Sequence, residues 1–200
     1  RTLGTLVFMG AVLYFGEAAC YFFAIDAGAP SGLVALLLYL SAAPNRSASR
    51  SALISLLWAD LEPDAAKHAL RQTIWYLKKK SGRELVRVDG DTLTLGDEVE
   101  VDRDALLDAS KAGDHARVVE LYAGPFVSSF AAPGGAGFEE WASLERRRLL
   151  ELFRHSAQAV ITGLLSRGKA RDAIPLARRL RDADVNHEGG WRLLIECCIS

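Results

Sequence analysis

Apolar side chains recur with a helical period between Ala65 and Gly82, the stretch on which the other predictions depend. At 100° per residue one face collects the mostly apolar side chains Ala66, Leu70, Thr73, Ile74 and Leu77. The opposite face is polar and basic, with His68, Arg71, Gln72, Trp75 and Lys79 on it and Lys67 and Lys78 at its edge. Pro63 and Asp64 suit a first turn and Gly82 suits the residue after the last turn, so the pattern predicts one amphipathic helix.

Shorter patterns come before and after this helix. Thr2–Met9 and Cys20–Ile25 are rich in β-branched and aromatic residues and predict strands, and Leu33–Leu40 predicts a short buried helix. Ser49 can cap a helix over Arg50–Trp58, in which the apolar side chains share a face. Asp89-Gly90 lies between two alternating runs and predicts a hairpin over residues 85–95.

Beyond Gly96-Asp97-Glu98 the apolar period becomes helical, so we place a domain boundary there. The predicted helices cover Asp104–Ala112, Asp114–Tyr122, Phe138–Arg167, Ala170–Ala183 and Glu188–Ile199, with a loop over Ala131–Gly137. Gly113-x5-Val119-x-Leu121 recurs as Gly168-x5-Ile174-x-Leu176, which suggests tetratricopeptide-like helix pairs, although the spacing of 55 differs from the usual period of about 34. Pro175 should kink its helix or mark a weak first turn.

Composition limits the function classes. The 200 residues are half hydrophobic and carry a net charge of −1, so a nucleic-acid interaction would have to use a local basic patch. Six Lys or Arg and no acid lie between Ala65 and Arg83. Cys20, Cys197 and Cys198 form neither a disulfide framework nor a metal cluster, which favours a reduced, cytoplasmic setting. The chain begins with Arg and ends on an apolar run, so we expect a piece of a longer protein.

The basic helix has two explanations: a solvated surface helix, or a helix that docks in the major groove and reaches phosphates and base edges. The order of elements favours the second, because strands, three helices and a hairpin in succession describe a winged helix-turn-helix. The predicted fold class is mainly α with small β-sheets: a winged helix-turn-helix over residues 1–98, then a tetratricopeptide-like all-α domain over residues 99–200. The expected DNA-binding residues are Arg50, Lys67, His68, Arg71, Gln72, Trp75, Lys78, Lys79 and Arg87.

Residues 58–82, WADLEPDAAKHALRQTIWYLKKKSG, resemble the central stretch of the Streptomyces antibiotic regulatory protein family. Those regulators join an OmpR-type winged helix to a bacterial transcriptional activator domain, which the second half resembles in Glu120–Phe126, Glu140–Leu149, Asp172–Leu176 and Trp191–Leu194. The resemblance implies binding to direct-repeat promoter DNA and recruitment of RNA polymerase, and such repeats would suit a homodimer on that DNA. Arg71-Gln72 matches the family's Arg-Gln, whereas Trp75 and Tyr76 stand where the family usually has polar or basic residues.

The turn before the basic helix is acidic. In the resembled family this turn is offered to RNA polymerase, which implies polymerase contacts by Asp60, Leu61 and Glu62. The alternative is helix capping, since Glu62 or Asp64 near a helix N-terminus favours the positive end of the dipole. Acids so close to phosphate should in either case point away from DNA.

The sequence contains little that indicates catalysis or the binding of a metal or cofactor. The four histidines have no metal-ligand spacing, Gly134–Gly137 lacks the Lys-Ser/Thr of a phosphate loop, and no nucleophile motif occurs, so we expect neither enzyme activity nor a metal or cofactor. Trp141, Leu144, Leu152 and Phe153 are expected in the core, and Arg146–Arg148 on a solvated face.

Three hypotheses follow from the sequence. The first is a promoter-binding activator, the second a helical-repeat adaptor that binds protein, and the third a membrane-tethered sensor. Glu17 and the glycines at 4, 10 and 16 interrupt the apolar residues 3–25, which argues against the third and for no membrane contact.

Overall fold

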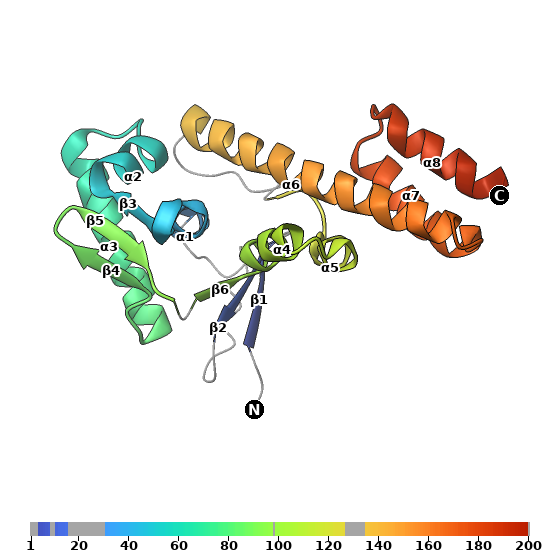
Figure 1. The fold of residues 1–200 in the computed structure, drawn as a ribbon. Helices are drawn as coiled ribbons and strands as arrows, with labels where there is room; N and C mark the ends of the chain where they lie inside the picture. The colour runs from blue at the N-terminus through green and yellow to red at the C-terminus, as the bar shows by residue number, and fades with distance from the viewer. Residues whose placement is uncertain (1–3, 9–10, 16–30, 98, 127–134, 200) are drawn as a thin grey trace. The chain divides into compact units, whose positions relative to one another are not determined.

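The chain folds mainly into helices, with two small antiparallel sheets (Figure 1). The computed structural model describes residues 4–8, 11–15, 31–97, 99–126 and 135–199. Its contacts group into two compact units, one made of residues 1–102 and 127–144, the other of residues 103–126 and 145–200. The boundary expected at residues 96–98 therefore lies inside the first unit, which also takes in the start of a later helix.

One sheet of the first unit joins strands distant in sequence. Its order is β1 (Gly4–Phe8), β2 (Ala11–Phe15) and β6 (Val99–Val101), all antiparallel, with Leu13 opposite Val101 and Phe15 opposite Val99. β1 lies within the strand predicted over Thr2–Met9, whereas β2 was not predicted. The strand expected at Cys20–Ile25 lies outside the described residues.

Three helices form the centre of the first unit: α1 (Ser31–Ala42), α2 (Arg50–Leu57) and α3 (Pro63–Ser81). Leucines of α1 are buried around its whole circumference, which confirms the buried helix expected there. With Leu53 and Leu57 of α2 and Leu70 and Leu77 of α3 they make the core. Nowhere in the described ranges does a helix combine the length and the hydropathy needed to cross a bilayer.

A second sheet follows the order β3 (Ser47–Ser49), β5 (Thr92–Leu95), β4 (Val86–Asp89). The Ser49 side chain accepts a hydrogen bond from the Ala52 N–H (3.1 Å), so Ser49 caps α2 as predicted. Asp89 pairs with Thr92, which places Gly90 and Asp91, rather than Asp89 and Gly90, at the centre of the hairpin turn. Gly90 has a φ of 55°, a conformation that suits glycine at the first central position.

The link from α1 to β3 is the one-turn helix η2 (Pro44–Arg46). Asn45 and Arg46 both adopt positive φ, 52° and 55°, in the left-handed region that side chains with a Cβ rarely enter. A guanidinium nitrogen of Arg46 donates to the carbonyl of Val99, so this turn is held to β6.

All the regular elements among the described residues of the second unit are helices. Its elements are α4 (Asp102–Lys111, of which all but the first residue belong to this unit), α5 (His115–Leu121), the later part of α6 (Gly135–Leu165), α7 (Ala170–Ala183) and α8 (Glu188–Ile199). Gly113 and Gly168 have φ of 71° and 69° and stand just before α5 and α7. The sharp turns predicted at both glycines are therefore confirmed. Pro175 lies inside α7.

Three predictions around α6 are wrong. Gly135–Gly137 belong to α6 and not to a loop, because the helix begins three residues earlier than its apolar period shows. Leu144, expected in the core, is 53 % exposed. Arg146, expected on a solvated face, is half-buried because its Nε donates to the carbonyl of Phe126 at 2.7 Å.

Candidate nucleic-acid interface

Helix α3 has one buried and one exposed face, divided as its sequence predicts. Ala66, Leu70, Thr73 and Leu77 are buried against the first unit. The predicted contact residues His68, Arg71, Gln72, Trp75 and Lys79 are all exposed, and Trp75 is 60 % exposed. Gly82 ends the helix in a left-handed conformation with a φ of 66°. The helix therefore presents a basic and aromatic surface about three turns long to its surroundings.

The cations of this surface differ in their partners. The Lys67 ammonium lies 3.1 Å from an Asp64 carboxylate oxygen and the Lys78 ammonium 3.2 Å from a Glu84 oxygen. Both are exposed pairs of the kind that contribute little to stability, so water or a stronger anion can replace the carboxylate. The Lys79 ammonium instead lies 4.6 Å from the ring centroid of Trp75, within the range of a cation–π interaction.

Arg50 and Arg87 extend the basic surface to α2 and the hairpin. Arg50 Nε donates to the Gly90 carbonyl (3.1 Å) and its backbone N–H donates to the Asp91 carbonyl (2.8 Å). These bonds tie the first turn of α2 to the hairpin turn, and they leave the Arg50 side chain half-buried. Arg87 is exposed on β4, opposite Thr94 of β5.

A pocket of about 390 Å³ lies where α2, α3 and the hairpin turn meet. Three of the predicted DNA-binding cations, Arg50, Lys67 and Arg71, line it together with Asp91 and two serines of α2. The structure thus brings together three cations that lie up to 21 positions apart in sequence. An oxyanion such as a phosphate is the group that this set of side chains would attract.

The acidic turn before α3 is exposed at all three predicted polymerase-contact residues, Asp60, Leu61 and Glu62. Leu61 is 45 % exposed. Glu62 occupies the N-cap position of α3, yet its carboxylate makes no capping hydrogen bond to a described residue. Asp64 lies in the first turn, where a negative charge favours the helix dipole.

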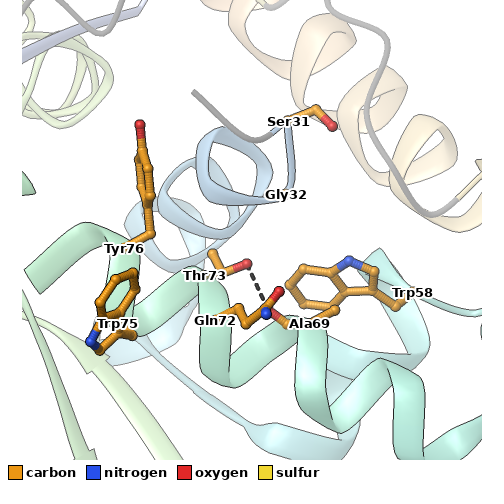
Figure 2. A pocket seen from close by; sticks show the side chains of 8 residues that line it. All are labelled: Ser31, Gly32, Trp58, Ala69, Gln72, Thr73, Trp75 and Tyr76. Carbon is orange, nitrogen blue, oxygen red and sulfur yellow. Dashed lines mark hydrogen bonds between the residues drawn. The ribbon is translucent and has the colours of Figure 1, made fainter. Parts of the chain in front are cut away.

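A second pocket, of about 490 Å³, opens beside the exposed face of α3 (Figure 2). Figure 2 shows its floor on α3, with Trp75 and Tyr76 at one end and the indole of Trp58 at the other. Ser31 and Gly32 of α1 close a further side, and the Thr73 hydroxyl donates to the Ala69 carbonyl at 2.8 Å. Two of its residues, Gln72 and Trp75, belong to the predicted DNA-binding set.

Sequence reasoning missed the cation that is most buried among the described residues. Arg103 at the start of the second unit is 6 % exposed and pairs with Glu145 (3.1 Å), whose side chain is 13 % exposed. Glu145 also pairs within α6, with Arg148 at 3.6 Å. No sequence signal joins residues 42 positions apart, so only the fold reveals this pair.

Two titratable groups of the second unit have a pKa that departs from the ordinary value. Burial raises the pKa of Tyr122, and the nearby Arg179 guanidinium lowers it in part. Burial also raises the pKa of Cys197, with smaller contributions from Cys198 and Glu196. His115 Nδ1 lies 3.2 Å from the Ser156 hydroxyl, but Ser156 is 1 % exposed and so closed to a substrate.

Over the described part of the chain, no three His, Cys, Asp or Glu side chains come together as a metal site would require. No protein-family model and no curated protein matches the chain.

Proposed function

We propose that the chain is a sequence-specific DNA-binding transcriptional activator of the Streptomyces antibiotic regulatory type. In this proposal α1 to α3 and the β4–β5 hairpin act as a winged helix-turn-helix, and α3 docks in the major groove of promoter DNA. The helices beyond β6 act as a tetratricopeptide-like activator domain.

The observation that carries the proposal is the exposed face of α3. Arginine and glutamine are the side chains best suited to bidentate contacts with guanine and adenine, and Arg71 and Gln72 are both exposed on α3, about 100° apart around its axis. Lys78 and Lys79 near the end of α3 and Arg87 on the hairpin suit phosphate contacts, which position the protein without reading sequence.

Selection of bound sequences from random duplex DNA, at two salt concentrations, tests the proposal. We expect a repeated sequence motif, with direct repeats if two copies bind together, and an affinity that falls as salt rises. Binding without sequence preference that is abolished by salt would contradict it.

A matched pair of variants tests the docked face. Arg71→Ala should weaken binding by about 1–3 kcal/mol and relax the preference at one base position. Arg147→Ala, an exposed arginine of α6 in the other unit, serves as the control and should leave affinity unchanged. Equal affinity of the Arg71→Ala variant and the parent chain, with the fold intact, would show that another face docks.

The acidic turn completes the activator proposal. Asp60, Leu61 and Glu62 are exposed and combine an apolar with two anionic side chains, a set suited to a protein surface rather than to DNA. We assign to this turn the contact with RNA polymerase.

A protein-interaction adaptor without a DNA role is the second candidate. The observation that favours it is an apolar stripe on the exposed side of α8, formed by Trp191, Ile195 and Ile199 at intervals of four residues. The same duplex selection separates the two, because an adaptor yields no enriched sequence.

A further inference from the structure

The pocket beside α3 has the dimensions and lining of a small-molecule site. Its volume of about 490 Å³ falls within the range of about 300–1,000 Å³ typical of ligand pockets. The indole of Trp58 is 8 % exposed and lies against Gly32, since a Cβ built on Gly32 would come 2.7 Å from Trp58 Cζ2. The pocket wall at this end is therefore tightly packed, and the missing side chain of Gly32 leaves room for the Trp58 indole.

Aromatic side chains stand at both ends of the pocket, with Trp58 facing the pair Trp75 and Tyr76 along α3 (Figure 2). Aromatic rings favour a flat partner that can stack or meet them edge to face. Trp75 in particular exposes 60 % of a large apolar side chain, which contact with a ligand would cover.

The polar groups of the pocket indicate the ligand's charge. Among the described residues that line it there is no Asp, Glu, His, Lys or Arg, and the polar groups are the Gln72 amide and the hydroxyls of Thr73, Ser31 and Tyr76. The Thr73 proton is already donated to the Ala69 carbonyl, so its oxygen is left to accept. Cations already stand near one end of the pocket, since the Lys79 and Lys80 ammoniums lie 4.6 Å and 5.6 Å from the ring centroids of Trp75 and Tyr76. A cationic ligand would therefore be repelled there, whereas a neutral donor–acceptor group is matched by the Gln72 amide.

We propose that this pocket binds an uncharged, planar bicyclic ligand that carries an amide or lactam, and that its occupancy releases DNA. The second half rests on the proposed function, because the ligand and DNA both require Gln72 and Trp75. Two ligands that share residues in this way exclude each other, so each lowers the apparent affinity of the other.

The four tryptophans of the chain supply the readout for binding in the absence of DNA. The indole N–H signals of 15N-labelled protein, assigned with single Trp→Phe variants, are followed while 2-quinolone, indole-3-carboxamide or isoquinolin-1-one is added. At least one of these neutral probes should shift the signals of Trp58 and Trp75 saturably and leave those of Trp141 and Trp191 in place. Absence of saturable shifts with all three probes, equal shifts at all four indoles, or tighter binding of anionic 2-naphthoate would overturn the proposal.

A matched pair of variants locates the polar contact. Gln72→Met keeps the length of an exposed side chain and removes the amide, and it should raise the Kd of the bound probe by about fivefold. Gln158→Met makes the same change at an exposed position of α6 in the second unit and should leave the Kd of the probe unchanged. Equal Kd values for the Gln72→Met variant and the parent would overturn the assignment of the Gln72 amide as the polar contact of the ligand.

Duplex binding tests the coupling separately. With the probe at ten times its Kd, the apparent Kd for the selected duplex should rise by about 11-fold. An unchanged duplex Kd at that occupancy would overturn the release of DNA. A chain that binds the probe but no duplex at all would refute the proposed function and leave the pocket assignment standing.

Discussion

Arg103 shows how much a single buried cation contributes to the second unit. Its guanidinium pairs with Glu145 and with Asp104, both at 3.1 Å. Arg103→Met leaves Glu145, itself 13 % exposed, without its buried counterion and should lower the free energy of unfolding by about 3–5 kcal/mol. Arg148→Met removes the exposed partner of the same carboxylate and should cost under about 1 kcal/mol. Urea unfolding of the two variants measures the two losses of stability. Similar losses would show that the burial of the removed cation does not determine how much stability is lost.

The adjacent cysteines should differ in reactivity. Cys197 is buried and Cys198 exposed, and burial raises the pKa of Cys197. Because the thiolate is the nucleophile, iodoacetamide at pH 8 should alkylate Cys198 first, and the rate at Cys197 should increase further as the pH is raised. The raised pKa also means that this thiol favours the folded state below its unfolded pKa, a contribution lost as pH rises through the folded value. Mass spectrometry of the alkylated peptides checks the order, and faster alkylation of Cys197 would contradict it.

At the scale of the element, replacing glycine by alanine should change the free energy of unfolding in opposite directions at the end of α3 and inside α6. Gly82 ends α3 with a φ of 66°, so Gly82→Ala introduces a strained Cβ and should lower the free energy of unfolding by about 1 kcal/mol. Gly163 lies inside α6, and apart from its chain neighbours and the backbone of its own helix no described atom comes within 4 Å of its Cβ position. Gly163→Ala should therefore stabilise by about 0.5–1 kcal/mol. Thermal unfolding of both variants tests this prediction, and melting temperatures that shift in the same direction would refute the conformational argument.

The turn from α2 to α3 carries the prediction about polymerase. Asp60→Ala should keep promoter affinity and melting temperature and should lower transcription in a purified system, since Asp60 is exposed and caps no helix in the described residues. Ala59→Ser changes the neighbouring residue, which is also exposed, and serves as the control. It should leave promoter affinity, melting temperature and transcription unchanged. Loss of DNA binding or a large drop in melting temperature for Asp60→Ala would show that the turn is architectural.

How well the sequence predicts an element depends on where its stabilising contacts lie. The bounds of α3 and the cap of α2 follow from Pro63, Gly82 and Ser49, because these residues act within one turn of their own position. The two faces of α3 follow from its period. The partial burial of Arg146 does not follow, because it depends on the carbonyl of Phe126, 20 positions away in sequence. The exposure of Leu144 does not follow from the apolar period of α6 either. The pocket of Figure 2 needs α1, Trp58 and α3 together, so no local pattern predicts it.

For the whole molecule, the start of α6 should be needed by the first unit. Phe138 is 1 % exposed, and the Trp141 ring meets that of Tyr39 of α1 edge to face, with centroids 5.3 Å apart. A fragment of residues 1–144 should therefore melt at least about 8 °C above a fragment of residues 1–102, given about 1.5–3 kcal/mol for burying one such side chain. Trp141→Ala in the longer fragment should remove part of the gain. Equal melting temperatures of the two fragments would show that residues 127–144 contribute nothing to the unit.

The strand order β1-β2-β6 has a consequence for the chain during its synthesis. The hairpin of β1 and β2 is complete at Phe15, but its partner strand begins only at Val99. At translation rates of about 5–20 residues per second, β2 waits about 4–17 s for β6 to be made. During that interval its free backbone groups form an open sheet edge, the kind of surface that pairs with other chains. The nascent chain is therefore exposed to aggregation until Val99–Val101 has been made, and a chaperone that binds extended segments would protect it during that interval.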